Sequence, residues 1–306
     1  MKTWALILAS IEKHGTAVMV SVMTTAGSVP RETGARLIVT PDGFNGSIGG
    51  GTLEWQALAK AQAQLNHPAG MKLSSHALGP ELGQCCGGRM QLATEVFDQT
   101  TLPKLRNFAK QELAGLFSIE NRLPGFVITE QFGELRRRLY LYGAGHVGRA
   151  LVMALAPLPF DVQWIDNRPN AFPTYAPENV TCIAPTNPLQ PLLDCPEGCL
   201  VWIMSHSHAL DLEVADAALR NSAVAHVGLI GSATKRARFE KRLQDAGVPE
   251  TRIKGMMCPI GVAGIRSKEP ASIALSAAAQ LQILHEQLLA NTGFEVRRVS
   301  LKGTVP

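Results

Sequence analysis

RLYLYGAGHVGRALVMAL, residues 138–155, reads as an apolar strand that passes through a glycine turn into a helix. Gly143, Gly145 and Gly148 stand in G-x-G-x-x-G spacing, a motif that is weak when it stands alone. The next apolar segment, FDVQWID, ends on Asp166, about 20 residues past Gly145, where a dinucleotide site uses an acidic side chain to bind a ribose hydroxyl. Together, the strand, the turn, the helix and the acid predict a Rossmann-like unit with a doubly wound parallel sheet.

The fold does not identify the ligand, and a dinucleotide and another phosphorylated ligand both stay open. In open α/β sheets, ligands bind at the carboxyl ends of the strands. The strand CLVWIM ends at Ser205, His206, Ser207 and His208, so these polar residues should face the crevice. His206 and His208 would form a metal set with Asp211, but the sequence offers no further ligand. We therefore expect hydrogen-bonding or loop-shaping roles for them.

Two more helices are expected after this crevice. Gly231 and Ser232 open a helix behind the strand VAHVGL, with Lys235 and Arg236 within reach of an anion at the helix start. The last is a long Ala/Leu-rich helix with Pro270 near its first turn.

The N-terminal half predicts an α+β unit. Residues 1–13 suggest a helix, and the runs TAVMVSVMTT and ARLIVT suggest two strands. Gly49, Gly50 and Gly51 then precede Thr52, a good N-cap for a helix. A glycine run that leads into a helix is an anion-binding arrangement, because the backbone N–H groups and the helix dipole point the same way. A plain tight turn is the alternative.

LGPELGQCCGGRMQL, residues 78–92, places two adjacent cysteines on a glycine-flanked loop. Consecutive Cα atoms lie about 3.8 Å apart, whereas an unstrained disulfide needs roughly 4.4–6.8 Å. A disulfide between Cys85 and Cys86 is therefore unfavourable, and Gly87 and Gly88 offer no side chain for core packing. The stretch predicts a site where backbone and sulfur approach a ligand closely, with two buried cysteines in a tight turn as the alternative.

The other four cysteines are expected to be structural or incidental thiols. They are Cys182, Cys195, Cys199 and Cys258. A zinc site at Cys195 and Cys199 would need a second pair at finger spacing, which the sequence lacks.

Length and composition indicate a globular α/β protein of two domains, which we place at 1–115 and 138–306 with a linker over 116–137. The net charge of +4 does not indicate nucleic-acid binding. No apolar run approaches the roughly 20 residues of a membrane span. The apolar residues after Lys2 lead into Glu12 instead of a small-residue cleavage site, so we expect a cytoplasmic protein without a signal peptide.

Eight stretches occur in the order GSVPRETGARLIV, GSIGGGTLEWQA, LGPELGQCCGGR, YGAGHVGRAL, IDNRPNAFP, MSHSHALDL, GLIGSATKRARF and CPIGVAGIRSKEPASIA. Along nearly the whole chain they resemble the xanthine dehydrogenase accessory protein family, whose members are molybdenum cofactor insertion chaperones. His226, where an aromatic residue is expected, is a small departure.

The resemblance implies a carrier of the molybdenum cofactor (molybdopterin), a pterin dithiolene that bears a phosphate and an oxygen-coordinated metal. Family members hold the cofactor while a cysteine desulfurase replaces an oxo ligand by sulfur, then insert it into apo-xanthine dehydrogenase, an enzyme of purine catabolism. They are not known to turn over a substrate. We also expect a homodimer, because cofactor cavities often lie where subunits or domains meet.

For such a cargo we expect Cys85 and Cys86 to lie at the cofactor site, with at least one thiolate close to molybdenum or its exchangeable ligand, because the thiolate is the ligating form of cysteine. The helix start at Gly49–Gly51 would take the phosphate. Arg89 and Arg31 are the expected partners of phosphate or oxo groups, with a plain surface position as the alternative for Arg31.

Two other functions stay open. A nicotinamide-dependent oxidoreductase would cycle the vicinal cysteines between thiols and a strained, easily reduced disulfide. A sensor of a phosphorylated ligand would bind without metal. No general acid–base pair stands at recognisable spacing in the sequence, which favours carriage over catalysis.

Overall fold

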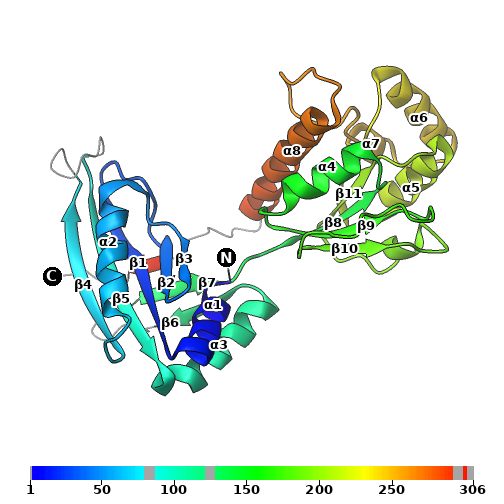
Figure 1. Cartoon of the computed structure of the whole chain (residues 1–306). Helices are drawn as coiled ribbons and strands as arrows, with labels where there is room; N and C mark the ends of the chain where they lie inside the picture. Colours follow the sequence, from blue (N-terminus) through cyan, green and yellow to red (C-terminus); the bar gives the residue numbers. More distant parts are fainter. Residues whose placement is uncertain (1, 79–86, 121–127, 292–298, 302–306) are drawn as a thin grey trace. The chain divides into compact units, whose positions relative to one another are not determined.

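The computed structural model describes residues 2–78, 87–120, 128–291 and 299–301, and the chain divides into two compact units (Figure 1). The first unit comprises Met1–Leu135 and Val296–Pro306, and the second comprises Arg136–Glu295. Among the described residues, no helix combines the length and the apolar character needed to cross a membrane.

The first unit is built on a five-stranded antiparallel sheet in the order β3-β2-β1-β5-β4. Its strands are β1 (Thr16–Ala26), β2 (Arg36–Thr40), β3 (Gly43–Gly46), β4 (Gly70–Ala77) and β5 (Arg89–Asp98). Seven consecutive residues of the central strand β1 are buried. Because successive side chains of a strand point to opposite faces, both faces of the sheet are covered at β1. This burial explains the unbroken apolar run that predicted the strand.

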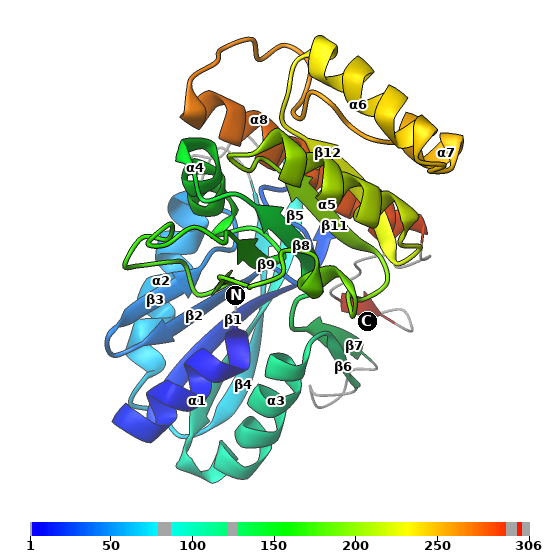
Figure 2. The ribbon, with the colours of Figure 1, turned by 90° about the vertical axis from the view of Figure 1, so that its right-hand side faces the viewer.

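Helices cover both faces of this sheet. Val18, Val20 and Val22 of β1 pack under α2 (Gly51–Gln64). Ala17 and Met19 face the opposite layer, formed by α1 (Thr3–His14) and α3 (Leu102–Ala114). Figure 2 shows these last two helices side by side. The predicted N-terminal helix and the first two predicted strands are confirmed.

A small three-stranded sheet, in the order β13-β7-β6, completes the first unit. It joins β6 (Phe117–Glu120), β7 (Ile128–Phe132) and β13 (Val299–Leu301). The predicted linker over 116–137 is therefore wrong for most of its length, because β6 and β7 pair with each other and Phe132 packs 4.7 Å from the ring of Trp4. The assignment of all residues of 138–306 to the second domain is wrong at its end, because β13 pairs with β7.

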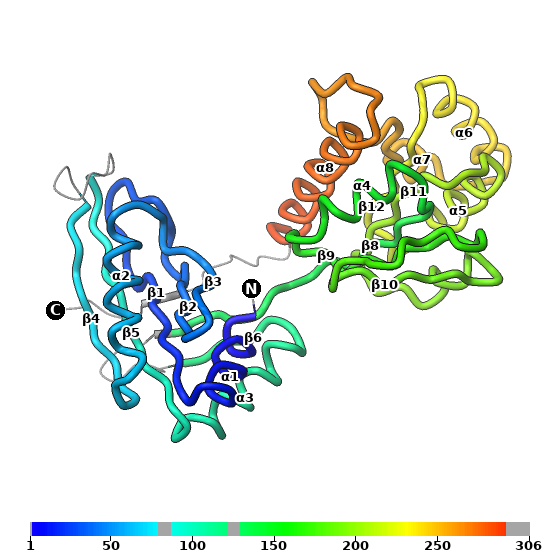
Figure 3. The backbone as a smooth tube through the Cα atoms, in the orientation of Figure 1, coloured from blue at the N-terminus to red at the C-terminus, as the bar shows by residue number. Residues whose placement is uncertain are grey.

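The second unit begins at β8, which the chain enters after β7 (Figure 3). Its sheet is fully parallel, in the order β10-β9-β8-β11-β12. The strands are β8 (Arg137–Tyr142), β9 (Phe160–Ile165), β10 (Val180–Ile183), β11 (Cys199–Ile203) and β12 (Val224–Leu229). The chain builds outward from β8 in one direction and then from β11 in the other, which is the doubly wound Rossmann arrangement.

Two hydrophobic layers flank this sheet, and β8 contributes to both. Leu139 and Leu141 pack with α4 (His146–Leu155) and α8 (Pro270–Asn291), while Tyr140 and Tyr142 face the other side. That second layer contains α5 (His208–Arg220), α6 (Ala233–Asp245) and α7 (Glu250–Lys254). The predicted fold class, an α+β unit followed by a Rossmann-like unit, is confirmed.

Candidate functional site

The glycine turn of the second unit connects β8 to α4, and two of its three glycines are required by close packing. Gly143 has φ +112°, and a Cβ there would lie 2.7 Å from the carbonyl carbon of Met204. A Cβ on Gly148 would collide with the carbonyl of Gly143. By contrast, a Cβ on Gly145 would meet no atom of the described residues within 4 Å. Gly145 is therefore the position where a ligand has room to approach the backbone.

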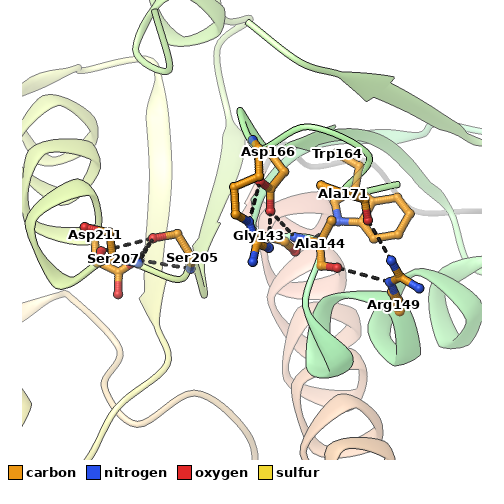
Figure 4. A network of polar contacts seen from close by, with 10 residues as sticks. Gly143, Ala144, Arg149, Trp164, Asp166, Ala171, Ser205, Ser207 and Asp211 are labelled. Carbon is orange, nitrogen blue, oxygen red and sulfur yellow. Dashed lines mark hydrogen bonds and ion pairs between the residues drawn. The ribbon is translucent and has the colours of Figure 1, made fainter. Parts of the chain in front are cut away.

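Asp166, at the end of β9, is engaged by the protein itself. Its carboxylate accepts hydrogen bonds from the amide of Ala144 (2.8 Å) and from the amide of Arg168 (3.0 Å). The guanidinium of Arg168 adds two more, from Nε at 3.0 Å and Nη2 at 2.7 Å. Figure 4 shows the carboxylate over the turn. Burial alone raises the pKa of Asp166, but the Arg168 and backbone hydrogen bonds outweigh it and lower the pKa to about 2.

A pocket of about 360 Å³ lies beside the start of α4. It is lined by Gly145, His146 and Arg149 on one side and by Arg168 and Asn170 on the other. Arg149 fixes the two walls together, because it donates to the carbonyl of Ala144 (3.1 Å) and to that of Ala171 (2.8 Å). The pocket is consequently shaped by the chain's own hydrogen bonds.

The crevice between β8 and β11, where the strand order reverses, is nearly closed by side chains. The space between Gly143, Asp166 and His206 amounts to about 10 Å³, close to the room that one water molecule needs. His206 borders this space, and both it and His208, at the start of α5, are exposed.

Ser205, Ser207 and Asp211 shape the loop after β11 through the hydrogen bonds of their side chains. The buried carboxylate of Asp211 accepts from the Ser205 hydroxyl at 2.6 Å and from its amide at 3.0 Å. Ser207 caps α5 by accepting from the amide of Leu210. In the described part of the chain, no group of three or more His, Cys, Asp or Glu side chains is placed to hold a metal ion.

The two basic residues at the start of α6 are held by internal partners. Lys235 Nζ lies 2.6 Å from Asp211 and 2.9 Å from the carbonyl of Ile230. Arg236 pairs with Glu240 at 2.7 Å. The anion that Lys235 reaches is therefore a buried carboxylate of the same unit.

In the first unit, the glycine run has positive φ at Gly49, Gly50 and Gly51 and leads into α2. Glu54 Oε2 accepts from the amides of Ile48 (2.8 Å), Gly49 (3.3 Å) and Gly50 (3.1 Å), and from the hydroxyl of Ser47 (2.6 Å). Burial alone raises the pKa of Glu54, but these hydrogen bonds outweigh it and lower the pKa.

The prediction that Thr52 is the N-cap of α2 is wrong. The N-cap position is Gly50, and no side-chain hydrogen bond caps the helix there. The Glu54 carboxylate, from inside the first turn, binds the amides that precede the helix.

Three of the predicted site segments meet at one end of the first unit's sheet. A Cβ on Gly49 would lie 2.5 Å from Pro30, with Arg31 alongside. A Cβ on Gly88 would lie 2.6 Å from the carbonyl of Ala26, and one on Gly27 would lie 3.2 Å from the Cα of Gly88. The loop after β1 therefore contacts both the glycine turn and the start of β5.

The remaining predicted residues of this end are partly described. Arg89 opens β5, pairs with Ala26 and is exposed, and Gly87 is exposed as well. Cys85 and Cys86 lie outside the described residues, and their role stays a prediction.

Two residues that hold the candidate sites in shape were missed by the sequence reasoning, Glu54 and Arg168. Each stands close in sequence to a predicted site, Glu54 in the turn of helix after the glycines and Arg168 two residues after Asp166. This closeness in sequence could have indicated their roles, because carboxylates commonly bind free backbone amides and arginines commonly pair with acidic side chains.

The chain thus combines a first unit built on an antiparallel sheet with a Rossmann unit whose glycine turn is bound by Asp166. The description XdhC Rossmann domain matches residues 139–281, and the description XdhC and CoxI family matches residues 10–72. The chain belongs to the XdhC family, as its eight sequence stretches predicted.

Two relatives illustrate the range of the similarity. The uncharacterized protein YqeB of Escherichia coli (strain K12) is 26% identical over 281 residues, which cover 88% of this chain and 44% of YqeB. The chain thus spans less than half the length of this curated relative. A crystal structure from Bacillus halodurans, described as a xanthine dehydrogenase, has a TM-score of 0.75 and 21% identity, and the match covers 94% of this chain and 96% of the other. At that identity the likeness shows the fold.

Proposed function

We propose that this chain is an accessory protein of xanthine dehydrogenase maturation that carries the molybdenum cofactor as cargo. It holds the cofactor while a cysteine desulfurase sulfurates it, and then inserts it into apo-xanthine dehydrogenase. XdhC family membership supports an accessory role rather than a catalytic one. The description of the Bacillus halodurans relative points to the same enzyme.

The observation that carries this proposal is the meeting of three glycine-rich segments at one end of the first unit's sheet. Gly88, which follows the vicinal cysteines by two positions, contacts the loop after β1, and that loop contacts the turn at Gly49. Glycines at these contacts let backbone segments approach one another closely. We propose that a rigid, bulky cargo binds at this end, from which the chain leads back to the vicinal cysteines two residues before Gly88.

The charges at this end suit an anionic cargo. Arg31 and Arg89 are exposed there and would pair with phosphate or oxo groups. The amides of Gly49 and Gly50 are already bound by Glu54, so the arginines would supply much of the attraction. A cargo held by exposed charges and by one labile thiolate can also be released, as insertion requires.

Replacing the vicinal cysteines tests the proposal. We expect Cys85→Ala, Cys86→Ala and the double variant to fold normally, to copurify with less molybdenum and pterin, and to fail to activate apo-xanthine dehydrogenase. The measurements are metal analysis, pterin fluorescence and transfer to apo-enzyme, with protein purified from cells that make the cofactor. Cys182→Ala is the matched control, because Cys182 is an exposed thiol of the second unit.

Full molybdenum content and a normal transfer rate in all three variants would exclude the thiols from the site. Arg31 and Arg89 would then become the first candidates for the centre of binding, since Glu54 already binds the amides of Gly49 and Gly50. Pull-downs from a competent cell extract that recover neither apo-xanthine dehydrogenase nor a cysteine desulfurase would count against the partners.

The second candidate is a nicotinamide-dependent oxidoreductase, which the Rossmann unit favours. The hydrogen bonds of Asp166 oppose it, because a carboxylate saturated by Ala144 and Arg168 is not available to a ribose diol. Hydride transfer from a nicotinamide, measured by absorbance with the purified protein, separates this candidate from the carrier.

A further inference from the structure

We propose that the pocket beside α4 binds a phosphomonoester and that Arg168 is the residue that recognises it. The pocket has a volume of about 360 Å³, near the lower end of the range for small-molecule sites. This inference concerns the second unit alone and does not rest on carriage of the molybdenum cofactor.

The role of Asp166 argues against a free ribose as the recognised group. A carboxylate has about four lone-pair sites, and four hydrogen bonds from Ala144 and Arg168 occupy this one. Its side chain is only 2% exposed. Asp166 occupies the position whose acidic side chain binds the ribose in a dinucleotide site, but in this chain it orients Arg168 instead.

Arg168 is positioned to take over recognition. Its side chain is 40% exposed and lines the pocket, while the two bonds to Asp166 fix the plane of its guanidinium. An oriented guanidinium binds phosphate with paired, charge-assisted hydrogen bonds. In Rossmann sites, an arginine near this acidic position accommodates a ribose phosphate.

The electrostatics of the pocket favour an anionic group. Arg149 and Arg168 bring two positive charges to its wall, and Asp166 compensates one of them. The first turn of α4 adds the positive end of its dipole next to Gly145, where the backbone is open to a ligand. A terminal phosphate matches this excess of positive charge.

Two classes of ligand carry such a phosphate group, nucleotides and phosphorylated pterins. Isothermal titration of the full chain with 5′-AMP, 6-hydroxymethylpterin phosphate and adenosine distinguishes them. We expect at least one phosphorylated probe to bind at least about tenfold more tightly than adenosine. The tighter of the two phosphorylated probes identifies the source.

Substitutions assign the binding to Arg168. Arg168→Leu should weaken the phosphorylated probe at least about tenfold, and Arg168→Lys, which keeps a cation beside Asp166 but loses the planar fork, should weaken it less. Arg138→Leu is the matched control, because it breaks a half-exposed ion pair with Asp161 at the opposite end of the sheet's strands. This control should bind normally.

Three results would overturn the inference: phosphorylated probes that bind no more tightly than about 1 mM, adenosine that binds as well as 5′-AMP, or a folded Arg168→Leu chain with unchanged affinity. None of them bears on the cofactor content of the purified protein, so failure here and failure of the carrier proposal are separate results.

Discussion

Two carboxylates, Asp166 and Glu54, perform the same task in the two units. Each binds backbone amides of a glycine turn that leads into a helix, at Ala144 in one unit and at Ile48–Gly50 in the other. An internal anion thereby satisfies N–H groups that a tight turn leaves without backbone partners. Both turns are held in shape by the chain itself.

Gly145→Val tests whether the open position of the second turn is a binding position. Its φ of −75° suits any residue, and the added side chain extends into space that the described residues leave empty. We expect loss of phosphorylated-ligand binding with an unchanged free energy of unfolding. Titration calorimetry and urea unfolding measure the two quantities.

Gly148→Ala is the contrasting variant, because its Cβ would collide with the carbonyl of Gly143. It should lose about 1–3 kcal/mol of stability through overpacking. If the folded Gly145→Val chain binds as well as the parent, the G-x-G-x-x-G motif serves the fold alone.

Asp166→Asn should make the second unit less stable at neutral pH by an amount that vanishes in acid. The folded pKa of about 2 lies below the ordinary 3.8, so the carboxylate contributes on the order of 2 kcal/mol above pH 3.8. That contribution is lost as the pH falls toward 2. Urea unfolding of the two chains across the acid range measures it, and a constant difference between them would contradict the assignment.

At the scale of single residues, the sequence predicted where a residue lies in the fold better than it predicted the hydrogen-bond partners of its side chain. Asp166 lies where the motif spacing predicts, yet its hydrogen bonds go to Arg168 and to the turn, which spacing alone does not reveal. Likewise, the sequence indicated a helix after Gly51 but not that Glu54 would bind the preceding amides. Side-chain direction decides such pairings, and it follows from the folded backbone.

At the scale of elements, local patterns identified the strands that form long, buried apolar runs and missed short or partly exposed strands. In the second unit, β8, β9, β11 and β12 are largely buried apolar runs, which a sequence reveals directly, whereas the edge strand β10 is partly exposed and was not predicted. By contrast, β6 and β7 are short, and β7 gains its second neighbour from β13, more than a hundred residues later. The charged run before β8 therefore suggested a linker where a small sheet exists.

Ending the chain at Asn291 tests this distant pairing. Loss of β13 leaves β6 and β7 as a two-stranded ribbon, which is marginal in water. We expect faster hydrogen exchange at the amides of β6 and β7 and unchanged exchange in β8, β9 and β11, which serve as the internal control. Equal protection of β7 in the truncated and full chains would show that β13 does not stabilise the sheet.

At the scale of the whole molecule, the second unit is an insertion within the first. The first unit comprises Met1–Leu135 and Val296–Pro306, with the complete Rossmann sheet between these segments in sequence. Sequence patterns placed the start of the second unit at 138, and in the structure this unit begins at Arg136. They gave no sign of the return, because β13 spans only three residues.

Because β13 comes from the C-terminal segment, the two units are completed in a fixed order during translation. Translation proceeds at roughly 5–20 residues per second, so a nascent chain that has exposed β7 must wait on the order of ten seconds for Val299–Leu301. During that interval the whole Rossmann unit is synthesised and has all the strands it needs to fold. The first unit, although begun first, is the last to be completed, and until then one edge of β7 is open to whatever strand the cell presents.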